Sequence, residues 1–306
     1  MWRWCCWGVA IVGMTAAEPP SLFSVAMAVG SPNVGDELAE ELDRVGCELA
    51  AGVTVTLPSG LLPRTGPVPA AVVEELAGRF RWDRFAADSR LAPVAMTIKP
   101  VMAEGSRVGH QVRAAFTLRT RLSEHLAERD DSDRLGLGPV DAGGAARPLT
   151  VEELEKAGVR PAADGNERFV FFEIRLLNRI NLKGVIRIQR RVTPDSIEVA
   201  WAFDHRFDHL TDLATTAARI ESNDRGERVI APPQPYAGGG GIVRARTLAD
   251  GETTASVLPV VVVESRLVFS EPESWFGGSN LLRAKIPLIT QEGVRTLRRR
   301  MQQTGR

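Results

Sequence analysis

The stretch Phe169–Phe203, FVFFEIRLLNRINLKGVIRIQRRVTPDSIEVAWAF, carries the strongest strand signal in the chain. Apolar and polar residues alternate along it, which is typical of β-strands that bury one face. Residues 193–196, TPDS, interrupt the alternation with turn residues, and the proline fixes φ at the second turn position. The stretch therefore predicts an antiparallel hairpin. The apolar residues expected on the buried faces of its strands are Val170, Phe172, Ile174, Leu176, Ile186, Ile188, Ile197, Val199, Trp201 and Phe203.

Two further parts of the chain show strand patterns. Val108–Thr120 alternates apolar and polar residues, which predicts a strand with one solvated face and hence an antiparallel sheet. Asp250-Gly251 supplies turn residues between Ile242–Leu248 and the apolar run Val257–Phe269, which predicts a second hairpin. The glycine run Gly238–Gly241 opens into a strand and not into a helix, so we interpret it as a flexible gate or hairpin entry and not as a phosphate loop.

Helical periodicity appears on both sides of these strands. Residues 33–50 and 70–86 predict two helices, because apolar residues recur in them every three or four positions. Cys47 falls off the apolar stripe of the first, so we expect a quiet, partly packed thiol. Asn280–Gln303 predicts a long C-terminal helix, which Pro287 should kink or divide. This order of helices, antiparallel strands and one long final helix predicts an α+β fold.

The composition is that of an ordinary globular protein. Of 306 residues, 44% are hydrophobic and 25% charged, which is enough apolar material for a real core. Lysine plus arginine and aspartate plus glutamate both number 38, so the net charge is zero. This balance argues against nucleic-acid binding, which needs a basic surface, and against electrostatic attachment to an anionic membrane.

The N-terminal residues 1–28 have the order of a secretory signal peptide. A short basic start precedes the apolar run Trp4–Met14, which is far shorter than the roughly 20 residues that span a bilayer. Small residues follow and allow cleavage after Ala17 or Ala28. We therefore expect a secreted, periplasmic or cell-envelope protein, with no transmembrane span after cleavage. An uncleaved N-terminal anchor and a misassigned start codon are the alternatives.

Histidines are the first candidates for chemistry. His110 falls on the apolar face of its predicted strand, and we expect either a hydrogen-bonded histidine at the edge of the core or a polar group projecting into a ligand cavity. Asp204, His205 and His209 follow the end of a predicted strand. Two histidines four residues apart could reach one metal ion from a helix, but Arg206 stands where a zinc protease needs glutamate. A solvated loop is the simpler reading, and we assign no catalytic residue, no metal site and no cofactor.

Trp275 and Phe276 lie in a glycine-bearing loop just before the final helix. Such a pair usually caps a core as a hydrophobic plug. The alternatives are a lid over a cavity and a contact for a partner or a membrane.

Together these features resemble the START-like helix-grip superfamily, in which a curved antiparallel β-sheet wraps around a long, kinked C-terminal helix. The hairpin Phe169–Phe203, the second hairpin Ile242–Phe269 and the helix Asn280–Gln303 carry the resemblance, which covers residues 90–303. Members hold lipids, sterols or other apolar molecules between sheet and helix, and some act as cyclases or hydrolases. The resemblance implies a curved antiparallel sheet that follows the N-terminal helices in the chain. The long, kinked C-terminal helix would pack against this sheet.

The resulting plan is a signal peptide over 1–28 and a single α+β domain over 29–306, with a helical part (33–90) and a β-rich, START-like part (90–306). Our leading hypothesis is an exported, non-catalytic binding protein for an apolar small molecule or lipid. One alternative is an enzyme of the same fold, hydrolase- or cyclase-like, that uses His110 or the Asp204/His205/His209 cluster. Another is a structural or protein-interaction module of the cell envelope. The expected ligand-binding residues are His110, Phe116, Phe172, Trp201, Phe203, Trp275 and Phe276.

Overall fold

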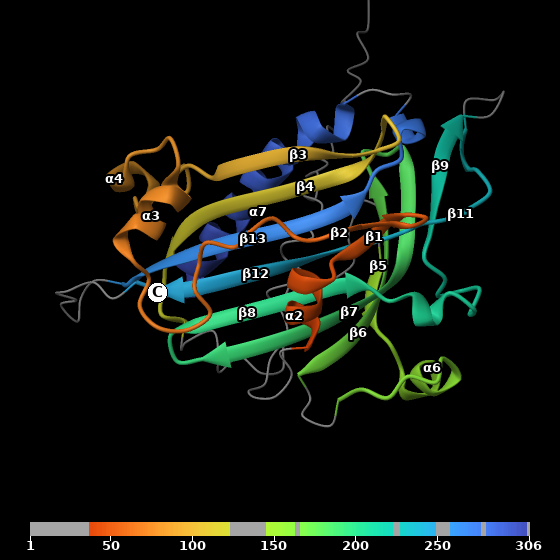
Figure 1. Ribbon diagram of the computed structural model, residues 1–306, viewed down its shortest axis with the longest axis horizontal. Helices are drawn as coiled ribbons and strands as arrows, with labels where there is room; N and C mark the ends of the chain where they lie inside the picture. The colour runs from red at the N-terminus through yellow and green to blue at the C-terminus, as the bar shows by residue number, and fades with distance from the viewer. Residues whose placement is uncertain are drawn as a thin grey trace, which may run out of the picture.

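The computed structural model describes residues 37–122, 145–162, 166–222, 227–248, 258–276 and 280–304, and it has the expected α+β architecture (Figure 1). The predicted signal peptide and the Asp250-Gly251 turn lie outside these ranges. In chain order the elements are α2 (Glu37–Arg44), β1 (Cys47–Ala50), β2 (Val53–Val55), α3 (Ala70–Ala77), α4 (Trp82–Phe85), β3 (Ala95–Ala103), β4 (Ser106–Arg119), β5 (Ala145–Pro148), α6 (Val151–Lys156), β6 (Glu167–Leu176), β7 (Ile180–Thr193), β8 (Ser196–Phe203), η1 (His205–Phe207), β9 (Thr216–Ser222), β10 (Arg228–Ile230), β11 (Gln234–Pro235), β12 (Gly239–Thr247), β13 (Val260–Ser270), η2 (Glu273–Phe276) and α7 (Leu281–Thr304).

One large antiparallel sheet of eleven strands organises the described part of the chain. From the β3 edge the strands run β3-β4-β13-β12-β8-β7, and β6 and β5 continue beyond β7 (Figure 1). The first half of β7 pairs with β9 and the second half with β8, so the sheet changes partners along this strand. Both predicted hairpins are confirmed: Thr193 faces Ser196 across the β7–β8 turn, and β12 pairs with β13 from Gly239↔Phe269 to Thr247↔Val261.

The first predicted helix is too long, and glycine is the reason. α2 ends at Arg44, and Cys47 already belongs to β1. Between them Gly46 adopts φ +88°, and a Cβ at this position would lie only 2.2 Å from the carbonyl oxygen of Val55. A glycine that can take positive φ ends a helix without strain. The predicted helix over 70–86 is likewise divided into α3 and α4, because Gly78 adopts φ +59° after α3.

The two faces of the sheet are covered by different elements. α7 lies behind the sheet, whereas α2, the β1–β2 hairpin, α3 and α4 lie in front of it (Figure 1). Of the two interpretations of Gly238–Gly241, hairpin entry is confirmed and the flexible gate is wrong, because Gly239, Gly240 and Gly241 are buried residues that begin β12. A Cβ on Gly240 would lie 2.8 Å from the Cys47 sulfur, so glycine lets the front layer approach the sheet closely.

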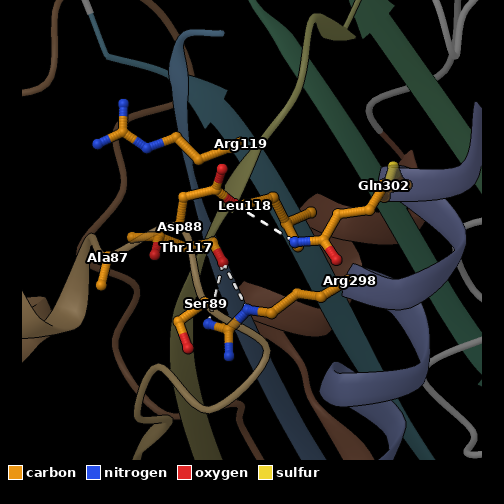
Figure 2. Close-up of a pocket in the computed structure, with 9 residues that line it drawn as sticks. Ala87, Asp88, Ser89, Thr117, Leu118, Arg119, Arg298 and Gln302 are labelled. Atoms are coloured by element: carbon orange, nitrogen blue, oxygen red, sulfur yellow. Dashed lines mark hydrogen bonds between the residues drawn. The ribbon is translucent and has the colours of Figure 1, made fainter. Parts of the chain in front are cut away.

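α7 is one continuous helix that contains Pro287, so the proline does not divide it. Within the ranges that the structure describes, no helix combines the length and the apolar character required to cross a membrane. The helix is attached to the sheet by Arg298, whose guanidinium reaches the backbone of β4 (Figure 2).

Arg298 is a buried cation without a carboxylate partner in the described part of the chain. Its Nε and Nη2 donate to the carbonyl of Thr117 at 3.1 and 3.0 Å, and Nη1 donates to the carbonyl of Ala92 at 2.6 Å. The guanidinium also lies over the ring of Phe116, 5.9 Å from its centroid. Burial lowers the pKa of Arg298 to about 10, so the side chain stays charged at neutral pH. The adjoining pocket holds about 10 Å³, which is room for one water molecule and not for a ligand.

Candidate functional site

His110 is fully buried and lies against a carboxylate. It stands in β4 opposite Phe269 of β13, and the side chains of His110 and Glu271 are both 0% exposed. Nε2 of His110 is 2.7 Å from Oε2 of Glu271, an ion-pair distance. The approach does not have hydrogen-bond geometry, so both ring nitrogens and Oε2 lack a hydrogen bond to any residue that the structure describes. Buried polar atoms without a partner are uncommon in native proteins, and functional sites are one place where they occur.

Arg107 and Tyr236 complete this polar cluster at the end of β13. Nη2 of Arg107 is 3.3 Å from Oε1 of Glu271, so the carboxylate faces a guanidinium as well as the imidazole. Nη1 of Arg107 donates to Oδ1 of Asn280 at 2.5 Å, next to the start of α7. The hydroxyl of Tyr236 donates to the carbonyl of Ser270 at 3.0 Å, and burial raises the pKa of this tyrosine. The cluster thus connects β4, β13 and α7.

A continuous row of aromatic rings leads from β6 to the residues before α7. The rings of Phe172 and Phe203 are 5.3 Å apart, and Phe203 is 5.1 Å from Tyr236. Tyr236 stacks on Trp275 at 5.4 Å, and Trp275 meets Phe276 edge-on at 6.5 Å. Tyr236, which the strand patterns did not single out, is therefore the central ring of the row.

The seven predicted ligand-binding residues lie on the same side of the sheet, the side that α7 covers. Phe116 and Trp201 are buried in the core on this side, together with rings of the aromatic row. His110 joins them through Phe269, whose ring centroid is 5.6 Å away and which packs against the same core. Sequence alternation placed Phe116, Phe172 and Trp201 on the apolar faces of their own strands, and strand pairing makes these faces one.

The surface of α7 that packs on the sheet is apolar and partly buried. Leu282 and Val294 are buried against the sheet. Four more apolar side chains of α7 pack against this core and remain partly exposed: Leu281, Ile286, Leu297 and Met301. The apolar stripe of α7 is therefore only partly removed from water.

The Asp204–His209 cluster serves the local backbone. Asp204 pairs with Arg206 at 2.6 Å and accepts from its backbone N–H, and His205 lies 2.8 Å from Asp208. His209 meets a backbone carbonyl at 3.5 Å. These residues form the short helix η1 after β8, as expected for a polar loop at a strand end. Over the described ranges, no group of three or more His, Cys, Asp or Glu side chains is arranged to hold a metal ion.

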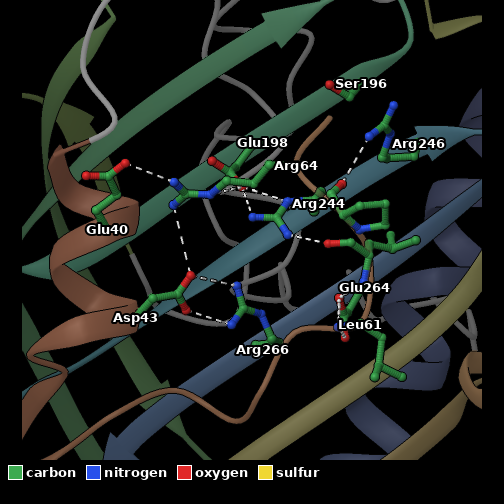
Figure 3. A network of polar contacts seen from close by, with 12 residues as sticks. Glu40, Asp43, Leu61, Arg64, Ser196, Glu198, Arg244, Arg246, Glu264 and Arg266 are labelled. Atoms are coloured by element: carbon green, nitrogen blue, oxygen red, sulfur yellow. Dashed lines mark hydrogen bonds and ion pairs between the residues drawn. The ribbon is translucent and has the colours of Figure 1, made fainter. Parts of the chain in front are cut away.

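The front face of the sheet carries a row of charges that are largely buried (Figure 3). Glu198 of β8, Arg244 of β12 and Glu264 of β13 stand directly opposite one another across three strands. Arg244 donates to Oε2 of Glu198 through Nε at 2.7 Å and to the carbonyl of Leu62 at 2.5 Å. Glu264 accepts the backbone N–H groups of Leu61 and Leu62 at 3.0 Å.

These charges hold the segment between β2 and α3 against the sheet. Arg266 bonds the carbonyl of Pro58 at 3.1 Å and Asp43 of α2 at 2.7 Å, while Arg246 bonds the carbonyl of Pro63 at 3.1 Å. Sequence reasoning missed this network because alternating charged residues were taken to face water. The signal was available in Arg244 and Arg246, which alternate within an otherwise apolar strand.

We expect the thiol of Cys47 to be unreactive in the folded chain. It is buried beneath α2, and desolvation together with Glu41 raises the pKa of its thiol to about 12. The thiolate is the nucleophile, so native protein at pH 8 should leave Cys47 unmodified by iodoacetamide, while urea-unfolded protein should be alkylated. Peptide mapping by mass spectrometry measures the modification at this cysteine alone. Rapid alkylation of native Cys47 would contradict the burial of the β1 strand.

No protein-family model matches the sequence, and no curated protein is significantly similar to it.

Proposed function

We propose that this chain is an exported binding protein for an apolar small molecule or lipid, built on the START-like helix-grip plan. The ligand would lie between α7 and the face of the sheet that carries His110, Phe116, Phe172, Trp201 and Phe203, with Trp275 and Phe276 at the mouth of the site. The observation that carries the proposal is that these residues, distant in sequence, share this one face. The large antiparallel sheet with a C-terminal helix across it supports the helix-grip assignment.

The partly exposed apolar side chains of α7 give the proposal its energetic basis. Removing apolar surface from water stabilises a complex by roughly 25 cal/mol per Å². Leu281 and Ile286 pack against the core and retain partly exposed apolar surface. A ligand inserted there would bury it without opening the hydrogen-bonded sheet.

The His110–Glu271 pair would receive the polar end of the ligand. His110 and Glu271 have polar atoms that are buried and lack a hydrogen bond. A hydroxyl or carboxyl group on the ligand would form hydrogen bonds with these atoms. Such bonds would stabilise the complex, because an unsatisfied buried polar atom costs about 1–3 kcal/mol. The proposed ligand is therefore apolar with one polar end.

Two measurements on the full chain test this function. Native mass spectrometry of protein purified from its host's cell-envelope fraction should show an added mass that organic extraction removes. The same spectrum should give a polypeptide that begins at Glu18 or Val29, as signal cleavage predicts. Titration with cis-parinaric acid, a fluorescent fatty acid, should show saturable binding.

Two variants of α7 separate the proposed site from general hydrophobic contact. Ile286→Gln places a polar group on the surface facing the core and should weaken parinaric acid binding about tenfold or more, as expected when an apolar contact is lost. Leu288→Gln makes the same kind of change on the exposed side, where Leu288 is 57% exposed, and should leave binding unchanged. A bare polypeptide mass together with equal affinities of both variants would refute the proposal and favour an interaction module or an enzyme.

A further inference from the structure

β3 is an edge strand with free backbone groups. In the described part of the chain it pairs only with β4, and the order of strands in the sheet ends with it. Pro100 lies within β3, and a strand accommodates proline where the ring nitrogen faces away from the neighbouring strand. Backbone groups of alternate residues point to the same side, so those of Met96 and Ile98 also face outward. Pro100 ends this run of outward donors.

A groove of about 590 Å³ follows the free edge before the proline. Its floor is the first half of β3, and its walls come from the end of α3 and the first half of α7. These helices lie on opposite faces of the sheet (Figure 1). Leu76 and Phe80 border the groove on the α3 side, while Met96 and Pro287 border it on the α7 side.

This two-sided lining favours an added strand over a compact small molecule. A strand sends successive side chains to opposite faces of its sheet. A segment paired with β3 would therefore place alternate side chains against the α3 wall and the α7 wall. Strand addition to an exposed edge is an established mode of peptide recognition, in which main-chain hydrogen bonds supply affinity and side-chain pockets supply specificity.

The charge of the groove selects the kind of peptide. Arg79 and Arg113 line the α3 side, and Arg283 lines the α7 side. Among the ion pairs of the described residues, none involves these three arginines, and Glu75 is the one acidic residue in the lining. Lys99 is exposed on the same edge. Pairing with β3 of a second copy would bring these cations together, so the charge disfavours a homodimer through this edge.

We propose that the β3 edge binds an extended acidic peptide segment of a partner protein by strand addition. Acidic side chains at alternate positions would meet Arg79 and Arg113. The intervening apolar side chains would pack on Met96 and Pro287, near Arg283. This proposal rests on the groove alone and is independent of the lipid-binding function.

The test uses the full chain and a peptide labelled at its N-terminus, fluorescein-Glu-Val-Glu-Val-Glu-Val-Glu-amide, and follows binding by fluorescence anisotropy. We expect saturable binding that weakens as salt is raised, because exposed charge pairs are screened. The peptide with lysine in place of glutamate should not bind. The acidic peptide with N-methyl groups on alternate backbone nitrogens should bind at least tenfold more weakly, because it lacks the donors that pair with β3.

Arginine variants locate the site. Arg79→Gln and Arg113→Gln should each weaken binding about threefold to fivefold, the range of an exposed ion pair. Arg81→Gln is the matched control, since Arg81 lies outside the groove lining and pairs with Asp83. Equal binding of the N-methylated peptide would overturn the proposal. So would arginine-dependent binding of phosphatidylglycerol vesicles in the absence of peptide binding, or a dimer that the Arg113 variant stabilises.

Discussion

Replacing Arg244 by methionine should lower the free energy of unfolding by about 3–5 kcal/mol, because it leaves a buried carboxylate without its main partner. The side chains of Arg244 and Glu198 are only 7% and 9% exposed. Arg64 is the nearest substitute, but its Nε is 3.8 Å from Glu198 Oε2, too far for a hydrogen bond. The variant also removes the bond to the carbonyl of Leu62 and so loosens the segment between β2 and α3. Equilibrium urea unfolding, followed by circular dichroism, measures the change.

Two comparisons separate the burial of this ion pair from its mere presence. Arg81→Met removes a pair of the same chemistry, Arg81–Asp83, whose side chains are 86% and 66% exposed, and should cost at most about 1 kcal/mol. The double variant Glu198→Leu/Arg244→Met removes both buried charges and should recover most of the loss, because no uncompensated charge remains. If Arg244→Met costs no more than Arg81→Met, Glu198 does not depend on Arg244 in the folded chain.

Replacing Arg298 by alanine should cost about 2–4 kcal/mol, because this side chain supplies three hydrogen bonds from α7 to the backbone of Thr117 and Ala92. Its three hydrogen bonds to the carbonyls of Thr117 and Ala92 are charge-assisted, and each is worth about 1.5–3 kcal/mol. Part of the stability lost with these hydrogen bonds is recovered, because the variant also removes the cost of burying the guanidinium, which lowers the pKa of Arg298. Arg298→Lys should also destabilise, because an ammonium group cannot reproduce the planar donor geometry.

A neighbouring arginine on the same helix provides the control for Arg298. Arg295 pairs with Glu292 one turn away, and both side chains are more than 40% exposed. Arg295→Ala should therefore change the free energy of unfolding by less than about 1 kcal/mol. Thermal unfolding by calorimetry compares the two variants directly. Equal effects of the two substitutions would show that α7 is held by its apolar contacts alone.

Local patterns were sufficient for β4, for the strands of the two hairpins and for the apolar face of each of these strands. Period-two alternation located β4, β7 and β8, and the residues 193–196 located the β7–β8 turn. The first helix was extended too far because Leu49 continues the spacing of Leu38 and Leu42. In the structure Leu49 is a buried residue of β1, beyond Gly46. An apolar residue at helical spacing from a helix can therefore belong to the next strand and still be buried in the same core.

Alternation predicted part of the candidate site, because it indicates which face of each strand is apolar. Alternation placed Phe116, Phe172 and Trp201 on apolar faces, and these faces proved to be one. It could not pair His110 with Glu271, because the two are separated by 161 positions and meet through the β4–β13 register. It also placed Glu198 on the face opposite Trp201 but could not show that the segment bearing Leu61 and Leu62 covers that face.

Local sequence patterns were enough for the α+β class, both hairpins and the long final helix, because each depends on neighbours within a few positions. The apolar faces of separate strands become one common face only through strand pairing. The tertiary structure alone decided the polar partners: Glu271 for His110, Glu198 for Arg244 and two backbone carbonyls for Arg298. It also decided that β3 is the free edge. These features depend on the order of the strands and on the elements that cover each face of the sheet. Periodicity in the sequence indicates which residues are buried, but it does not indicate which residues bury them.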